Sequence, residues 1–502
     1  MILHLDGNVS RYYVQTLCMI FFPGSTFGQN EEGGEGVPEI TVSVYPDENN
    51  VQTAYVSIKL NDRVCEAVET VDPSEEISIA THSSLAVGRA MFAAGKEMLG
   101  HIPPWGILTG IRPAKVAASL LYNGKGRVKA KKILRDEHFL NPQKAALAVS
   151  VASTEIKLLK KMPKNSCSLY ISIPFCPSRC AYCSFVSYTT KRLLSMIDEY
   201  LVVLLEELRQ KVAVIRALGM KIATVYIGGG TPTTLTENQL LALLSEIHTL
   251  IDTASLSEFT LEAGRPDTIT KEKLNIAKKY GVSRISVNPQ TLNDDILREI
   301  GRKHTAEDFF RAYNLAVESG IKDINVDLIA GLPSDDFKSF SETLDKVLLL
   351  RPSNLTVHSF CVKKAADLLR KNSDIYALSS QEATKSVSYA QLEAKFTGFK
   401  PYYMYRQKNT IGNLENVGFS LEGREALYNI YMMEDVQTIF GVGAGAVTKL
   451  VKSEGFSDPN AKITRFFNPK YPYEYLSKFE KRISENQSFN EEYERIFEFF
   501  SK

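Results

Sequence analysis

Between Ser168 and about Cys361 the sequence alternates six short β-branched runs with longer segments of helical periodicity. The runs are SLYISIPF, TVYIGGG, EFTLEAG, RISVNPQ, DINVDLI and NLTVHSF, and a typical helical segment is LTENQLLALLSEIHTLI. Strands rich in Val, Ile and Leu with helical crossovers between them predict a parallel sheet covered by helices. Six such units predict an α/β fold, a partial (β/α)6 barrel, in which chemistry lies at the carboxyl ends of the strands.

The rest of the chain predicts two further parts around this barrel. A length of 502 residues suggests two to four domains at roughly 150 residues each. Residues 1–165 are predicted to form an α+β module, because the strand patterns ITVSVYPD and VQTAYVSIKLND precede helical stretches such as SSLAVGRAMFAAGKEMLG. The barrel is predicted at 166–362, and a mixed α/β extension that covers the substrate at 363–502.

Composition excludes several classes of function. Apolar residues make up 44% and charged residues 23% of the chain, which is typical of globular proteins, and the net charge of +1 does not predict nucleic-acid binding. The basic run KGRVKAKKILR is interpreted as a solvated helix face. We expect no membrane span, since no apolar run approaches roughly 18 residues, and no signal peptide. Seven cysteines, an odd number and mostly scattered, favour a cytoplasmic protein.

Three cysteines are gathered in IPFCPSRCAYCSF, directly after the first run of the barrel. Cys176, Cys180 and Cys183 have the spacing C-x3-C-x2-C. A zinc site normally has four ligands in two pairs, and the sequence offers no second pair. A disulfide with a spare thiol disagrees with a reducing compartment, and three structural cysteines leave the spacing unexplained. A [4Fe–4S] cluster fits better, because thiolates suit iron and three ligands leave one iron open to a small molecule.

This loop, with Tyr182 directly before its third cysteine, resembles the radical S-adenosylmethionine (SAM) family. Within that family the sequence from about Ser168 to Val451 is similar to the oxygen-independent coproporphyrinogen III oxidases, and most to their HemZ-type branch. The resemblance implies a [4Fe–4S] cluster bound by Cys176, Cys180 and Cys183, with SAM on the open iron. It also implies reductive cleavage of SAM to methionine and a 5′-deoxyadenosyl radical.

The resemblance also implies roles for residues at the strand ends. Tyr170 and Glu262 are expected to act in catalysis, with Glu262 accepting the SAM ammonium or lying near the substrate. The expected SAM contacts are Tyr170, Tyr182, Gly230, Thr231, Glu262, Gln290, Arg302, Asp327 and Cys361. Gln290 and Asp327 are assigned to the ribose hydroxyls. Arg302 is assigned to the methionyl carboxylate, which a guanidinium binds with two hydrogen bonds. A GGG run alone is as often a turn as a site. Cys361 is expected to contact SAM through its backbone, and its thiol is better explained as part of the packed core.

The activity that the resemblance implies is oxidative decarboxylation of two propionates of coproporphyrinogen III, giving the vinyl groups of protoporphyrinogen IX in anaerobic haem formation. An electron donor such as flavodoxin or ferredoxin is expected. Two departures leave the substrate open: Phe185 stands where the oxidases carry a further cysteine, and the N-terminal module is larger than their leader. A haem-binding chaperone of the HemW type and a radical enzyme that modifies porphyrins in another way remain alternatives.

Two later segments carry weaker signals. PYYMYRQKN offers Tyr403 and Arg406 as contacts for a substrate with carboxylates on an apolar ring, although an amphipathic strand with core tyrosines explains it equally well. GVGAGAVTKL superficially matches a dinucleotide fingerprint, but it lacks the strand-to-helix unit and the downstream acid, so that interpretation is rejected.

Overall fold

The computed structural model divides into two compact units. The first comprises Met1–Ser153, Cys361–Ala377 and Met404–Glu415, and the second comprises Thr154–Phe360, Leu378–Tyr403 and Asn416–Lys502. The structure describes residues 1–502 apart from 23–24, 26, 28–35, 75–80, 101, 111, 184–186, 362–372, 408–409, 454, 456–457, 459–460, 485–489 and 502, and also without the side chains of 373–377, 479–484 and 490–491. The predicted boundaries at 165 and 362 stay a prediction.

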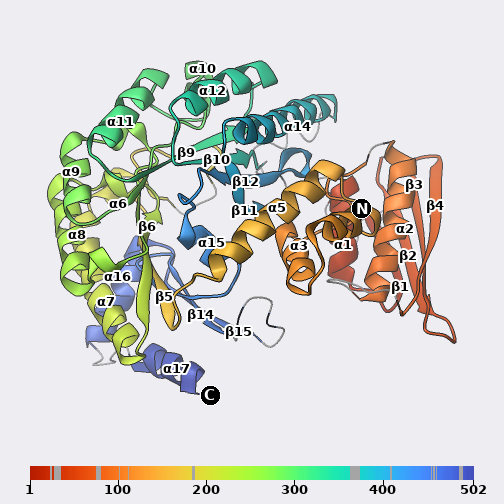
Figure 1. Ribbon diagram of the computed structural model, residues 1–502, viewed down its shortest axis with the longest axis horizontal. Helices are drawn as coiled ribbons and strands as arrows, with labels where there is room; N and C mark the ends of the chain where they lie inside the picture. Colours follow the sequence, from red (N-terminus) through yellow and green to blue (C-terminus); the bar gives the residue numbers. More distant parts are fainter. Residues whose placement is uncertain are drawn as a thin grey trace. The chain divides into compact units, whose positions relative to one another are not determined.

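A four-stranded sheet in the order β1-β2-β3-β4 forms the first unit together with helices (Figure 1). Its strands are β1 (Ile2–Gly7), β2 (Glu39–Pro46), β3 (Gln52–Leu60) and β4 (Arg63–Val71). Buried and exposed residues alternate along β2 and β3, so one face of the sheet joins the core. That core also contains residues of α1 (Arg11–Phe21) and α2 (His82–Leu99). Strands β2 and β3 and helix α2 match the elements expected from the sequence.

Three more helices belong wholly or mainly to the first unit: α3 (Pro113–Tyr122), α4 (Arg127–Asp136) and α5 (Pro142–Leu159). Helix α4 contains most of the basic run, and of its residues only Ala130 and Leu134 are buried. The interpretation of this run as a solvated helix face is therefore confirmed.

Six parallel strands form the centre of the second unit, in the spatial order β10-β9-β8-β7-β6-β5. They are β5 (Ser166–Ile173), β6 (Lys221–Gly229), β7 (Glu258–Glu262), β8 (Arg284–Ser286), β9 (Asp323–Ala330) and β10 (Asn354–Ser359). Strand β5 pairs on its other side with β13 (Thr438–Val442), and β10 pairs with β12 (Glu415–Ser420), so β5 and β10 do not close on each other. The predicted partial (β/α)6 barrel is confirmed.

Helices connect the six strands and lie outside the sheet (Figure 1). They are α6 (Lys191–Leu194), α7 (Ile197–Ala217), α8 (Glu237–Leu250), α9 (Lys271–Lys279), α10 (Asp294–Glu299), α11 (Ala306–Glu318) and α12 (Phe337–Leu349). Capping boxes fix where two of them begin: Thr236 with Gln239 precedes α8, and Thr305 with Asp308 precedes α11. Each box satisfies two backbone N–H groups that the first helical turn leaves free.

The C-terminal part extends the sheet on both sides of the barrel. Its elements are α14 (Ser373–Phe396), β11 (Lys400–Arg406), β12, α15 (Leu427–Met433), β13, β14 (Val447–Lys452), β15 (Lys462–Phe467), α16 (Pro472–Ser484) and α17 (Asn490–Ser501). GVGAGAVTKL forms the turn between the antiparallel strands β13 and β14. Gly441 is required there, since a Cβ would lie 2.7 Å from the Val447 backbone. Within the described residues the segment leads into strand β14 rather than into a helix, as expected from the sequence.

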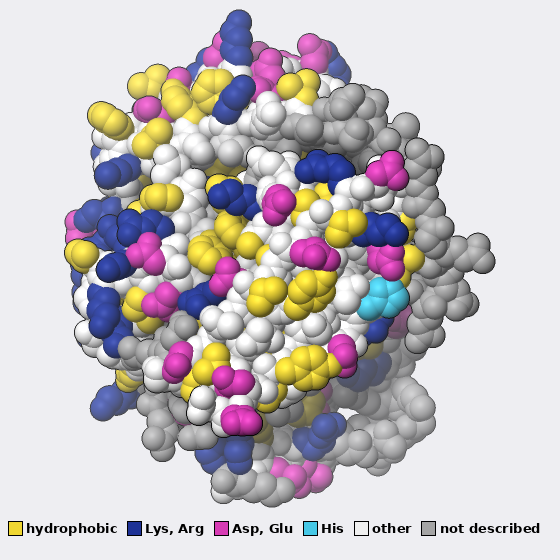
Figure 2. All heavy atoms as spheres, turned by 90° about the vertical axis from the view of Figure 1, so that its right-hand side faces the viewer, with side chains coloured by type: hydrophobic (Ala, Val, Ile, Leu, Met, Phe, Trp, Pro, Cys, Tyr) yellow, Lys and Arg dark blue, Asp and Glu magenta, His cyan; other side chains and the backbone are white. Residues whose placement is uncertain are grey.

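Within the described part of the chain, none of the helices combines the length and the apolar character that crossing a bilayer requires. Figure 2 shows one face of the surface, on which basic, acidic and hydrophobic side chains are interspersed. This mixture of charges agrees with the net charge of +1.

Candidate cluster and cofactor site

The cysteine loop, defined as residues Cys176 to Cys183, follows β5 and is closed at its base by backbone hydrogen bonds. The Cys176 N–H donates to the Tyr188 carbonyl (3.1 Å), and the Tyr188 N–H donates to the Pro174 carbonyl (2.9 Å). Phe175 and Tyr188 also form an isolated β-bridge. The chain therefore leaves the carboxyl end of β5 and returns to it. Phe185, where the sequence departs from the oxidases, lies outside the described residues.

The glycine motif at the end of β6 supports the base of this loop. The Gly230 N–H donates to the Ile173 carbonyl (2.8 Å), and the Thr231 N–H donates to the Phe175 carbonyl (2.7 Å). A Cβ on residue 230 would lie 2.5 Å from the Phe175 carbonyl oxygen, so glycine permits the close backbone approach. The Thr231 hydroxyl lies 3.3 Å from the Cys176 sulfur. Thr231 thus contacts the cysteine loop and Gly230 contacts the residues just before it, and the contact of both with SAM stays a prediction.

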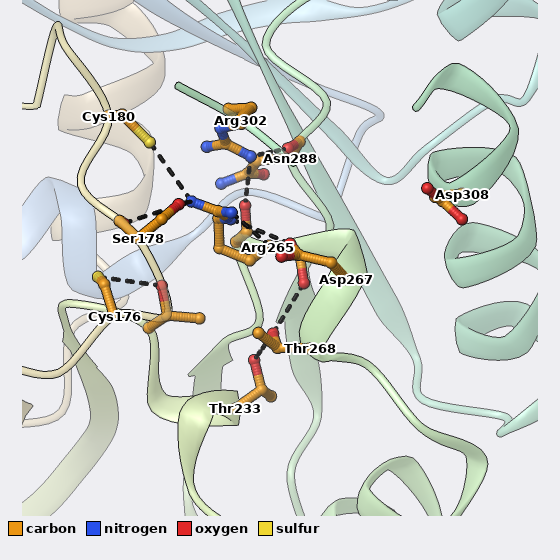
Figure 3. Close-up of polar contacts among 12 residues, drawn as sticks. Cys176, Ser178, Cys180, Thr233, Arg265, Asp267, Thr268, Asn288, Arg302 and Asp308 are labelled. Atoms are coloured by element: carbon orange, nitrogen blue, oxygen red, sulfur yellow. Dashed lines mark hydrogen bonds and ion pairs between the residues drawn. The ribbon is translucent and has the colours of Figure 1, made fainter. Parts of the chain in front are cut away.

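Arg302 connects the end of the cysteine loop, by hydrogen bonds, to the segments that follow β7 and β8. Its Nε and Nη2 donate to the Tyr182 hydroxyl (3.0 and 2.8 Å), and its Nη1 donates to the carbonyls of Gly264 (3.0 Å) and Asn288 (2.8 Å). The Ala181 N–H also donates to the Ile300 carbonyl, 3.0 Å away. Figure 3 shows the Arg302 guanidinium beside Asn288. Sequence reasoning assigned it to the SAM carboxylate, and that role stays a prediction.

Arg265 is a second buried cation at the loop, and the sequence analysis missed it. Its Nη1 lies 3.6 Å from the Cys180 sulfur and donates to the Ser178 hydroxyl (3.0 Å). Its Nε and Nη2 form a two-pronged ion pair with the Asp267 carboxylate (3.0 and 3.1 Å). Figure 3 shows the guanidinium between the cysteine loop and Asp267. The only signal in the sequence was its place in LEAGRPD, three residues after Glu262.

The cysteine loop contains three thiols, but they are not grouped around one metal ion. Cys176 and Cys180 are buried and Cys183 is half-buried, whereas Cys167 lies at the amino end of β5. Among the described residues no three His, Cys, Asp or Glu side chains are grouped closely enough to hold one metal ion. Burial raises the pKa of the Cys176 thiol to about 11, so metal binding there must displace a proton. Three cysteines in one loop, of which Cys180 lies beside the Arg265 guanidinium, fit an anionic, thiolate-bound cluster.

Glu262, at the end of β7, faces the stacked rings of three tyrosines. The Tyr226 hydroxyl donates to its carboxylate, and Tyr226 stacks on Tyr428 of α15, with ring centroids 4.4 Å apart, and more loosely on Tyr170 at 6.2 Å. Burial raises the pKa of Glu262 to about 7; the hydrogen bond from Tyr226 opposes this rise, and the charge of Asp327 adds to it. Glu262 and Tyr170, the two residues predicted to be catalytic, therefore both lie beside Tyr226, and their catalytic roles stay predictions.

Asp327 lies within β9, next to Gln290, which follows β8 and forms an isolated β-bridge with Leu328. The Asp327 carboxylate accepts hydrogen bonds from Asn288 (2.8 Å) and Asn325 (2.7 Å). Burial by itself raises the pKa of Asp327, but hydrogen bonds, the strongest from His358, outweigh it and lower that pKa. The Gln290 N–H donates to the Asp327 carbonyl (3.1 Å), and Gln290 adopts a positive φ of 71°. Its buried Oε1 has no hydrogen-bond partner among the described residues, so it fits a donor of a bound ligand.

Three further predicted contacts have these surroundings within their own units. Cys361 belongs to the first unit, where it forms a β-bridge with Thr410. Arg406 also belongs to the first unit; it is buried and donates to the Leu108 carbonyl. Tyr403 is buried in the second unit beside Gly418, where a Cβ would lie 1.9 Å from its ring. Their predicted contacts with SAM or substrate stay predictions.

Comparison with known proteins identifies the family. Residues 170–347 match the model of the Radical SAM superfamily. The chain is 38% identical to the "Oxygen-independent coproporphyrinogen-III oxidase-like protein HemZ" of Bacillus subtilis (strain 168). The alignment of 397 residues covers 78% of this chain and 78% of that protein. The chain is a radical SAM protein of the HemZ type. Membership of the superfamily implies a [4Fe–4S] cluster and SAM, and the HemZ type relates this protein to the coproporphyrinogen oxidases.

Two other proteins are similar to this HemZ-type protein over smaller parts. "Heme chaperone HemW" of Bacillus subtilis (strain 168) is 34% identical over 284 residues, 56% of this chain and 70% of HemW. The solved structure of Escherichia coli coproporphyrinogen III oxidase (HemN), described as a radical SAM enzyme, gives a TM-score of 0.49 at 23% identity, covering 65% of this chain and 72% of that chain.

Proposed function

We propose that this HemZ-type protein decarboxylates two propionate side chains of coproporphyrinogen III to vinyl groups without oxygen, in anaerobic haem formation. The observation that carries the proposal is the 38% identity, across 78% of both chains, to a protein named as oxygen-independent coproporphyrinogen-III oxidase-like. The anchored cysteine loop at the carboxyl edge of a parallel sheet supports it, because this edge is where parallel α/β folds place their chemistry.

Cys176, Cys180 and Cys183 are the proposed ligands of the [4Fe–4S] cluster. When the cluster and SAM are bound and reduced, they supply a radical that removes a hydrogen atom from the substrate. Gln290 offers SAM an unpaired buried acceptor, and the end of β7 offers it the Glu262 carboxylate. With a pKa of about 7, Glu262 loses its proton readily near neutral pH and then attracts an ammonium group.

The proposed reaction removes one hydrogen atom from the β-carbon of a propionate. The bond between the α-carbon and the carboxylate then breaks, CO2 leaves, and one electron passes to a one-electron acceptor, which leaves a vinyl group. The stacked rings of Tyr170, Tyr226 and Tyr428 place apolar surface beside Glu262. Such a wall keeps water from a reactive radical. A flavodoxin or ferredoxin in the cytoplasm is the proposed source of the electron that reduces the cluster.

The second candidate is a haem chaperone. It is favoured by the 34% identity to "Heme chaperone HemW" over 284 residues. The two candidates differ in outcome, because a chaperone binds haem and returns it unchanged, whereas the proposed enzyme consumes SAM and a porphyrinogen.

The test is an anaerobic assay of the reconstituted and reduced protein with SAM and coproporphyrinogen III, in which tetrapyrroles and 5′-deoxyadenosine are followed by mass spectrometry. We expect loss of two CO2 from the tetrapyrrole, and no loss with Cys180→Ala. Haem binding at wild-type iron content with no tetrapyrrole turnover would favour the chaperone.

A further inference from the structure

Arg265 is a buried cation that the proposed function does not use. We propose that Arg265, with Asp267 as its counter-ion, raises the reduction potential of the cluster by acting on Cys180. The inference rests on the proposed function, since it assumes that the cysteine loop holds a [4Fe–4S] cluster. Arg265 is a positioning residue in this proposal, because it acts through a ligand sulfur and touches neither SAM nor substrate.

The Arg265 guanidinium faces the cysteine loop with Nη1 and the Asp267 carboxylate with its opposite edge (Figure 3). Nη1 lies 3.6 Å from the Cys180 sulfur and 3.0 Å from the Ser178 hydroxyl. Nε and Nη2 bind Asp267. The Arg265 side chain is 3% exposed and that of Asp267 24%, so water screens the cation poorly and the carboxylate somewhat better.

Reduction adds one negative charge to the cluster and its thiolates. A buried cation that donates to a ligand sulfur stabilises the reduced form more than the oxidised form, and therefore raises the potential. Asp267 opposes this effect, because its negative charge offsets that of Arg265. The two residues should thus shift the potential in opposite directions when each is neutralised. The electron comes from a low-potential one-electron donor, and no other group is oxidised in this step.

Arg302 also interacts electrostatically with Cys180, but Arg265 is the cation that contacts the Cys180 sulfur with a hydrogen-bond donor. The hydrogen bonds of Arg302 go to the Tyr182 hydroxyl and to two carbonyls. His304 is buried; this burial, together with the charge of Arg302, lowers its pKa to about 3, so it carries no charge at neutral pH. Among the described side chains, Arg265 is the cation whose guanidinium donates to the Cys180 sulfur.

The experiment compares Arg265→Gln, Arg265→Lys and Asp267→Asn, with Ser178→Ala as the matched control. Ser178→Ala removes the hydroxyl that accepts a hydrogen bond from Nη1, but it keeps the Ser178 carbonyl 3.5 Å from Nη1 and leaves Arg265 beside Cys180. Each protein is reconstituted anaerobically, its iron and sulfide are measured, and its cluster is titrated electrochemically while the reduced form is followed by electron paramagnetic resonance.

At the wild-type midpoint potential, we expect Arg265→Gln to lower the ratio of reduced to oxidised cluster on the order of tenfold. This corresponds to a midpoint potential that is lower by about 59 mV for one electron. Asp267→Asn should raise that ratio, Arg265→Lys should restore part of it, and Ser178→Ala should leave it near the wild-type value.

An unchanged midpoint in Arg265→Gln at wild-type iron content overturns the inference and leaves the proposed function intact. If Arg265→Gln binds no cluster, Asp267→Asn decides, because it retains Arg265; no upward shift in that variant also overturns the inference. A wild-type protein that takes up no cluster contradicts the proposed function itself.

Discussion

Glu262 should make the stability of this protein fall as pH rises, and replacing it with glutamine should remove that fall. Burial raises the pKa of Glu262 from 4.5 to about 7 in the folded chain without ligands. Below pH 4.5 the carboxyl group is protonated in both the folded and the unfolded chain, and the fold has its full stability. Between 4.5 and 7 the unfolded chain loses this proton and the folded chain keeps it, so the free energy of unfolding falls.

The size of the effect follows from the two pKa values. Each pKa unit corresponds to about 1.4 kcal/mol, so a rise from 4.5 to about 7 corresponds to about 3 kcal/mol. Glu262→Gln, which carries no titrating proton, should gain that amount relative to the wild type between pH 4.5 and pH 8. For the second unit, about 3 kcal/mol should appear as a difference of several degrees in the melting temperature.

The assay is thermal unfolding of the cluster-free wild type and Glu262→Gln at matched scan rates from pH 4.5 to pH 8. Glu272→Gln, at an exposed position of α9, is the control and should follow the wild type at every pH. Infrared difference spectra of the wild type and Glu262→Gln should show a protonated carboxyl group at pH 6. Melting temperatures of Glu262→Gln and the wild type that stay parallel over this pH range would refute the reasoning.

Three further predictions concern the loop and the cofactor. Alanine at Cys176, Cys180 or Cys183 should each remove most of the iron and sulfide bound after reconstitution, measured by colorimetric analysis; wild-type content in any variant contradicts the assigned ligand. Gly230→Ala should displace the backbone at the base of the loop by several tenths of an ångström and lower the free energy of unfolding by about 1–3 kcal/mol. The melting temperature and the iron content should both be lower than in the wild type. Wild-type values for both would show that the backbone at Phe175 shifts without cost. Arg302→Ala should weaken SAM binding at least tenfold in equilibrium dialysis of the reconstituted protein, and unchanged affinity would remove its proposed role.

The barrel was predictable because its strands and helices carry strong local signals. The β-branched runs from SLYISIPF to NLTVHSF became β5 to β10, and capping residues such as Thr236 fix the helix starts between them. The three cysteines were recognisable from their spacing alone. The rejection of a dinucleotide site at GVGAGAVTKL rested on the lack of a following helix, and the structure shows two strands there instead.

Other features depend on contacts between residues far apart in sequence. Gly230 was interpreted as a cofactor contact. In the structure, a side chain at this position is excluded by the backbone of Phe175, 55 positions earlier in the chain. Arg265 carried no separate signal, because the approach of a guanidinium to Cys180 arises only when β7 lies beside the cysteine loop. The pKa of Glu262 was equally hidden, since it arises from burial among rings of β5, β6 and α15.

The central claim is best tested by following one hydrogen atom. Coproporphyrinogen III labelled with deuterium at the propionate β-carbons is incubated anaerobically with the reduced protein and SAM, and 5′-deoxyadenosine is analysed by mass spectrometry. The account predicts deuterium in 5′-deoxyadenosine together with vinyl groups in the tetrapyrrole product. Cleavage of SAM without transfer of deuterium, in a protein that carries its full cluster, would contradict it.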